Sequence, residues 1–148
     1  MWTKSKSLLL TRAAILLFML LLLSIGVLLP RIVDLYIKSG LMPPEDRWPT
    51  LILGWLFVPP AFIALICMNG VLKNIRQNQI FIHHNVKLFR TLSWCCCFAA
   101  LPLLLYGWFD LASFVFAGIL GLVTLLLRVA KNMLEAAVNI KEENDLTV

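Results

Sequence analysis

Charged side chains are scarce in this sequence and unevenly spread. Asp, Glu, Lys and Arg make up 14% of the 148 residues, and there are only two histidines. Asp110 is the one charged residue between Arg90 and Arg128, and the windows 13–30 and 48–72 contain none. Because a charge in hydrocarbon is costly, charged residues inside apolar segments usually mark proton relays or catalysts. Their absence argues against a proton-coupled transporter, a pump or an intramembrane hydrolase.

The sequence also lacks the motifs of common catalytic and metal-binding sites. There is no nucleophile–base pair, phosphate-binding loop or zinc motif, and the four cysteines show no C-x-x-C spacing. Cys95–Cys97 are adjacent, so their side chains point in different directions, and Cys67 is expected at a similar depth on another span. Metal binding and reversible S-acylation are alternatives for these thiols, but small apolar packing residues are the simplest interpretation. We expect no enzymatic activity, no metal and no cofactor.

Apolar residues, in contrast, are abundant. Hydrophobic residues make up 61% of the chain and the mean hydropathy is +0.89, which is more than a soluble domain of this length could bury. A membrane-spanning helix needs roughly 20 apolar residues, and four segments qualify: 13–33, 50–72, 91–108 and 111–130. The sequence therefore predicts an all-α integral membrane protein of four helices, with residues 1–148 forming a single domain in the lipid bilayer.

The first apolar segment has the positively charged flank of a secretory signal peptide. Lys4, Lys6 and Arg12 precede it. However, the segment is longer than a usual signal-peptide core and ends in Leu-Leu-Pro-Arg rather than in a small-residue cleavage site. We interpret it as a retained membrane span.

Lysine and arginine are distributed unequally between the two sides of the predicted bundle. Ten of the 13 lie in the N-terminal segment, in a loop over 73–90 and around a tail over 131–148, which share one side when there are four spans. Positively charged segments stay in the cytoplasm, so both termini are predicted to be cytoplasmic and Asp110 to mark a tight outer turn. We expect a multi-pass protein of a bacterial inner (plasma) membrane. The net charge of +5 is then a topology signal rather than a sign of nucleic-acid binding.

The aromatic residues fit two membrane interfaces, with Trp48, Trp55, Tyr106 and Trp108 on the outer side and Trp2 and Trp94 on the inner side.

Small residues on the last span indicate a site of close helix packing. Ser113, Ala117 and Gly121 recur at four-residue spacing, which lets another helix approach closely. The partner is either the span 91–108 or a second copy of the chain, and the second case would make a homo-oligomer. On the second span, Pro59-Pro60 removes two backbone donors and predicts a kink.

The last helix is predicted to continue beyond the membrane as an amphipathic helix until about Lys141. Its apolar face would carry Val129, Met133, Ala137 and Ile140, with Leu134 and Val138 on its flank. We expect this face to pack on the 73–90 loop, with the headgroup layer or a partner protein as alternatives. In that loop, Asn85 is expected to cap a helix that begins at Val86.

Two stretches on the predicted cytoplasmic side resemble a known family. One covers residues 80–90, Ile-Phe-Ile-His-His-Asn-Val-Lys-Leu-Phe-Arg, and the other covers the tail 136–148. Together with the four-span layout, they resemble a bacterial membrane family catalogued as domain of unknown function 2975. In that family a Ser or Thr usually follows the residue that corresponds to Phe81, whereas here it is Ile82. The resemblance implies no established activity. It implies a gene neighbourhood with a small helix-turn-helix regulator, and hence a signalling or regulatory role.

The same two stretches are predicted to form one cytoplasmic interaction surface. Its expected members are Phe81, Asn85, Lys87, Arg90, Glu142, Asp145 and Leu146. We expect a regulatory or interaction protein whose partner, by family association, is a small cytoplasmic helix-turn-helix regulator. The alternative is a small oligomeric transporter or channel subunit, with a path lined by Ser24, Asn69, Ser113 and Thr124. A third class, a thiol oxidoreductase, would use Cys95–Cys97.

Overall fold

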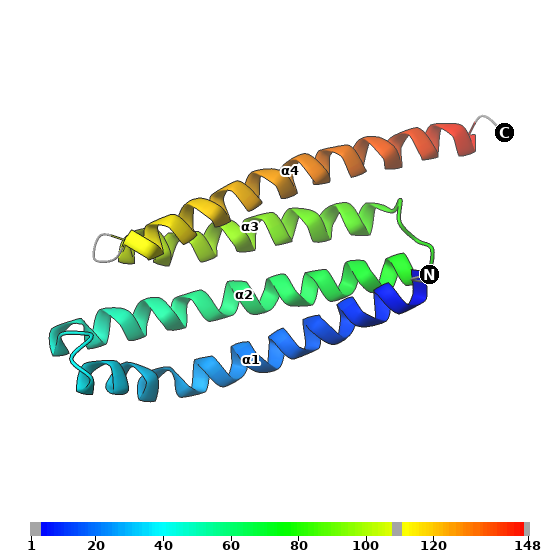
Figure 1. Ribbon diagram of the computed structural model, residues 1–148. Helices are drawn as coiled ribbons and strands as arrows, with labels where there is room; N and C mark the ends of the chain where they lie inside the picture. The colour runs from blue at the N-terminus through cyan, green and yellow to red at the C-terminus, as the bar shows by residue number, and fades with distance from the viewer. Residues whose placement is uncertain (1–3, 108–110, 147–148) are drawn as a thin grey trace.

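Four long α-helices account for most of the chain (Figure 1). The computed structural model describes residues 4–107 and 111–146, so Trp2, Trp108, Asp110 and the last two residues of the tail lie outside the described part. The helices are α1 (Lys4–Lys38), α2 (Arg47–Arg76), α3 (His83–Tyr106) and α4 (Leu111–Leu146), with a short 3₁₀ helix, η1 (Pro44–Asp46), before α2. All four are long and apolar enough to cross a membrane. The prediction of an all-α protein with four candidate spans is therefore confirmed for the described residues.

The helices form an open row in chain order. α1 packs on α2, α2 on α3 and α3 on α4 (Figure 1). The outer helices bury little: 6% of the apolar window of α1 is buried, against 33% for α3. Side chains such as Val27 on α1 and Leu125 on α4 are therefore exposed. An apolar surface of this extent needs a lipid or protein environment, which fits a membrane protein.

One end of the row gathers three parts of the chain that are distant in sequence. The start of α1, the α2–α3 connection and the end of α4 lie at the same end (Figure 1). Arg47 and Asp34 lie toward the other end, where the guanidinium Nε is 2.7 Å from the Asp34 carboxylate. The hydrogen bond from Arg47 holds the pKa of Asp34 below its ordinary value. This ion pair ties the end of α1 to the start of α2.

The connection between α2 and α3 is shorter than predicted. α2 continues to Arg76 and α3 begins at His83, so only residues 77–82 of the expected 73–90 loop are non-helical. α2 ends with the Gln77 N–H donating to the carbonyls of Lys73 and Asn74. Asn78 then adopts a left-handed conformation with φ of 60°, which asparagine tolerates better than most residues. The tail likewise stays helical to Leu146, beyond the predicted end near Lys141.

The start of α3 also differs from the prediction. Asn85 does not cap a helix at Val86, because α3 begins two residues before Asn85. The N-cap position is occupied by Ile82, whose extended backbone (φ −138°, ψ 145°) is typical of a cap, but no side-chain hydrogen bond closes it. Ile82, which departs from the family pattern, thus lies at the position where a side-chain hydroxyl could cap α3.

Replacing Ile82 by threonine is expected to stabilise the protein. A hydroxyl at an N-cap accepts a hydrogen bond from the first turn of the helix, which is worth about 1 kcal/mol. The free energy of unfolding of Ile82→Thr, measured by denaturation in detergent micelles, should therefore rise by about that amount. Ile82→Val is the matched control, since it keeps the branched Cβ without the hydroxyl. Equal stabilities of the two variants would contradict the capping role.

Candidate functional site

A buried amide fixes the conformation of the α2–α3 connection. The Asn85 side chain is 2% exposed, and its Nδ2 donates to the carbonyl oxygens of Gln79 (2.9 Å) and Ile80 (2.8 Å). Its Oδ1 accepts a hydrogen bond of 2.6 Å from Nδ2 of Asn74 on α2. All three contacts link the first turn of α3 to the preceding connection or to α2. Asn85 was predicted to belong to an interaction surface, but its burial makes it a residue that positions that surface instead.

The two stretches that carry the family resemblance meet at this end of the row. His83 Nε2, at the start of α3, lies 3.0 Å from Glu142 Oε1 near the end of α4. We call residues 77–87 and 139–146 the end surface. Phe81 is 46% and Leu146 is 86% exposed on it. Lys87, Glu142 and Asp145 are exposed as well. Most of the residues predicted for interaction therefore lie on the helix ends and the connection at this end of the row.

α4 turns a different face toward α3 than the sequence predicts. Ala117, Thr124 and Val138 are buried and the side chain of Lys131 is only 16% exposed, so residues at seven-residue spacing face α3. This heptad is typical of helices that pack side by side at a small angle. Val129, Met133 and Ile140 are exposed. The expectation that this apolar face packs within the chain therefore fails for these three residues, whereas Ala137 on the same face is half-buried and Val138 on its flank is buried.

The small-residue stripe is only partly used for packing. Ala117 is buried, and α4 packs on α3, so α3 is the partner at this position. Ser113 is half-buried. Gly121 is also half-buried, but a Cβ built on it would meet no heavy atom within 4 Å. The small residues at four-residue spacing therefore no longer face α3 at Gly121. The residues at seven-residue spacing face α3 as far as Val138.

A polar hollow of about 290 Å³ lies between α3 and α4 where their apolar segments end. Its lining is strongly basic and consists of Arg90, Ser93, Trp94, Arg128, Lys131 and Asn132. The Arg128 guanidinium lies 5.0 Å from the Trp94 ring centroid, in a cation–π contact. Lys131 forms an ion pair with Glu135, one turn along α4. Arg90, which was predicted for the interaction surface, lines this hollow. We call it the basic pocket.

The charge state of Glu135 is set by its cationic neighbours. The hydrogen bond from Lys131 holds the pKa of Glu135 below its ordinary value, although partial desolvation of the carboxylate raises it. The positive charges of Lys131, Arg90 and His83 also lower this pKa. Glu135 is therefore ionised at neutral pH and neutralises one of the three cations of the pocket. The sequence shows these charges, but it does not show that α3 and α4 bring them into one hollow.

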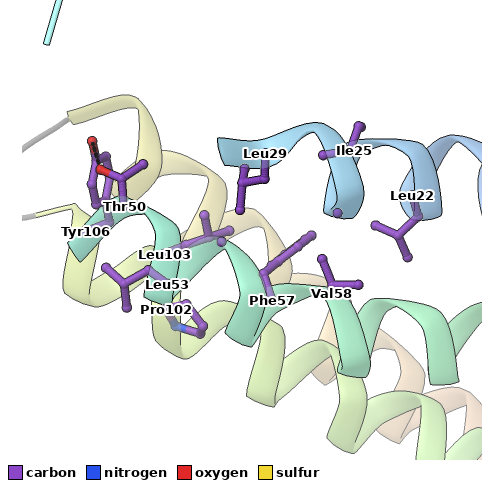
Figure 2. Close-up of a pocket in the computed structure, with 12 residues that line it drawn as sticks. Leu22, Ile25, Leu29, Thr50, Leu53, Phe57, Val58, Pro102, Leu103 and Tyr106 are labelled. Carbon is purple, nitrogen blue, oxygen red and sulfur yellow. Dashed lines mark hydrogen bonds between the residues drawn. The ribbon is translucent and has the colours of Figure 1, made fainter. Parts of the chain in front are cut away.

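A second cavity, of about 300 Å³, is almost entirely apolar. Figure 2 shows side chains from α1, α2 and α3 around it, with the hydroxyl groups of Thr50 and Tyr106 side by side at one end. These two oxygens are 3.2 Å apart, within hydrogen-bond distance. No charged residue lines the cavity among the part of the chain that is described. Its chemistry suits a hydrocarbon chain rather than a polar solute.

The polar residues proposed for a transport path do not line one path in a single chain. The Ser24 hydroxyl on α1 bonds the carbonyl of Leu20, and the Thr124 hydroxyl on α4 bonds that of Leu120. α1 and α4 lie at opposite edges of the row. Of the four cysteines, Cys67 and Cys95 are buried, and none forms a disulfide. The positions of Ser24 and Thr124 give no support to a transport path within one chain.

A family of known sequences matches most of the chain. A family described as "Protein of unknown function (DUF2975)" matches residues 44–148, from the start of η1 through α4. No curated protein and no solved structure matches the chain. The matched region contains the end surface, the basic pocket and both stretches that resemble the family. Because the match covers well over half of the sequence, the chain belongs to the DUF2975 family of proteins of unknown function.

Proposed function

We propose that this protein is a multi-pass membrane protein that acts by interaction rather than by catalysis. It presents the end surface to the cytoplasm of a bacterium, from the inner membrane, with both termini on the cytoplasmic side. The observation that carries the proposal is the contact between His83 and Glu142, which joins the two family-like stretches into one surface. The excess of Lys and Arg in the segments at this end supports the orientation.

The chemistry of the end surface suits a protein partner. Ile80, Phe81, Ile140 and Leu146 are exposed apolar residues of the end surface, which also carries the exposed charged residues Lys87, Glu142 and Asp145. An aromatic or aliphatic centre with a polar rim is typical of protein–protein interfaces. By family association, the partner we propose is a small cytoplasmic helix-turn-helix regulator. The membrane protein would then hold this regulator at the membrane surface.

Removal of residues 142–148 tests this function. The deletion removes Glu142 and Leu146 from the end of α4 but leaves its apolar segment 111–130 intact, so membrane insertion should be unchanged. The amount of regulator that co-purifies from native membranes is expected to fall at least about tenfold, as for loss of an interface anchor. Phe81→Ala should reduce capture in the same assay. Phe116→Ala is the matched control, because Phe116 is an exposed phenylalanine on α4 far from the end surface. Unchanged capture by the deletion variant would exclude the proposal.

The open row of helices supports a second candidate, an oligomeric channel or transporter subunit. Ser24 and Thr124 lie on the two edge helices, so they could line a common path only between copies of the chain. Solute flux into liposomes that contain the purified protein separates the two functions. The interaction function predicts no flux above that of empty liposomes, whereas a channel subunit would show it.

A further inference from the structure

The basic pocket lies at the level where the protein leaves the hydrocarbon. Arg90 is the last charged residue before the apolar run of α3, and Arg128 is the first after the apolar run of α4. Their side chains line the same hollow although they are far apart in sequence. A pocket at this depth is open to the headgroup layer of the membrane, where phosphate groups are the main anions.

The pocket has an excess of positive charge. Three cationic side chains line it, and the nearby carboxylate of Glu135 pairs with Lys131. Within residues 4–107 and 111–146, neither Arg90 nor Arg128 forms an ion pair with a carboxylate. Arg90 acts on Glu135 only through its charge and Arg128 lies over the Trp94 ring, so both guanidinium groups keep N–H donors for an external anion. Guanidinium is the side-chain group best suited to phosphate, since its planar fork can form two parallel hydrogen bonds to the oxygens.

Polar neighbours complete the lining. The Asn132 Oδ1 accepts a hydrogen bond from Lys131 Nζ, and the amide group of Asn132 supplies further donors. The Ser93 hydroxyl donates to the Thr124 carbonyl at 3.4 Å, so it secures α3 against α4 at the inner wall. The pocket is therefore held between two packed helices rather than on a loop.

An apolar stripe continues from the pocket along α3. Trp94 stacks on Phe98 with ring centroids 5.8 Å apart. Phe98, Leu101 and Leu105 are exposed and follow one another at helical spacing, so they share one face of α3 with Trp94. This stripe runs from the pocket toward the opposite end of the helix. A ligand with a phosphate at one end and hydrocarbon at the other would match both parts, which favours a lipid over a soluble phosphate.

We propose that the basic pocket binds the phosphate of an anionic phospholipid, held between Arg90 and Arg128, with an acyl chain lying on the Trp94–Leu105 stripe. This site is separate from the end surface. Loss of lipid binding and loss of partner capture can therefore be measured independently.

The test uses the purified full chain in a mild detergent. Native mass spectrometry measures the retention of phosphatidylglycerol and of phosphatidylcholine with identical acyl chains. We expect the wild type to prefer phosphatidylglycerol. Arg90→Gln and Arg128→Gln should each weaken that binding roughly tenfold, as expected for loss of one charged hydrogen-bonding group, and the double variant should lose the preference. Arg76→Gln is the matched control. It also removes one positive charge at this end of the row, but Arg76 does not line the pocket.

Further measurements keep the test decisive. Circular dichroism of each variant shows whether the helices are intact, and a folded double variant that keeps the preference would overturn the proposal. Equal binding of the two lipids by the wild type would overturn it as well. Inorganic phosphate is added in a separate arm, and complete displacement of phosphatidylglycerol by it would overturn the lipid assignment in favour of a soluble phosphate ligand.

Discussion

Replacement of Asn85 by alanine is expected to lower the free energy of unfolding by about 2–3 kcal/mol. The change removes three hydrogen bonds at once, because the amide contacts Asn74 on α2 and two carbonyls of the α2–α3 connection. The Asn74 amide loses its partner next to a position that is only 2% exposed. Unmade hydrogen bonds near a buried site cost more than exposed ones. Denaturation of the purified protein in detergent micelles measures the loss.

An aspartate at the same position should be worse than alanine at neutral pH. An ionised carboxylate can accept the hydrogen bond from Asn74, but it cannot donate to the carbonyls of Gln79 and Ile80. Repulsion by these oxygens favours the protonated form, so the pKa of the introduced carboxyl should be higher in the folded protein than in the unfolded chain. The stability of Asn85→Asp should therefore fall as the pH rises from about 4 to 7. Asn85→Ala should show no such additional dependence.

The control for both variants is an exposed asparagine on the end surface. Asn139 on α4 is exposed, and Asn139→Ala should change the free energy of unfolding by no more than about 0.5 kcal/mol. If Asn85→Ala were equally mild, the three hydrogen bonds of the Asn85 side chain would contribute nothing to the stability of the fold. Asn85→Ala should also reduce partner capture, since Phe81 lies in the segment that the amide positions.

Replacement of Gly107 by alanine is also expected to destabilise the protein strongly. A Cβ on Gly107, which follows α3, would lie 2.9 Å from Cβ and 3.0 Å from both Cα and the backbone nitrogen of Phe114 on α4. Backbone atoms cannot rotate away as a side-chain tip can, so α3 and α4 must separate locally. Overpacking of this kind costs about 1–3 kcal/mol, and we expect the upper part of that range. The same micelle denaturation measures it.

Gly118 on α4 provides the matched control for this variant. It is exposed, and a Cβ built on it meets nothing within 4 Å. Gly118→Ala should therefore be neutral or stabilise the helix by up to about 1 kcal/mol. Destabilisation by Gly118→Ala would indicate that a second copy of the chain packs on this face. A neutral Gly107→Ala would show that the α3–α4 contact is looser than its geometry implies.

The candidate site was only partly accessible from the sequence. The stretches around Phe81 and Glu142 were predicted to share a surface, and His83 and Glu142 do meet there. The role of Asn85 was not predicted, because its three partners depend on the path of the chain between α2 and α3. The basic pocket was also missed, although the charges of Arg90 and Arg128 at the ends of two apolar runs were a signal that could have indicated it.

The class of the protein and the existence of its helices could be read from the amino-acid sequence. Both follow from local quantities, since the thickness of the hydrocarbon sets the length of an apolar segment and each charge carries its own transfer cost. Which faces of those helices meet became visible only once the helices were packed together. In lipid an apolar side chain gains little by turning inward, because the surrounding tails are as apolar as leucine. The hydrophobic pattern of α4 therefore could not distinguish the heptad of Ala117, Thr124 and Val138 from its exposed face, and packing against α3 chose between them.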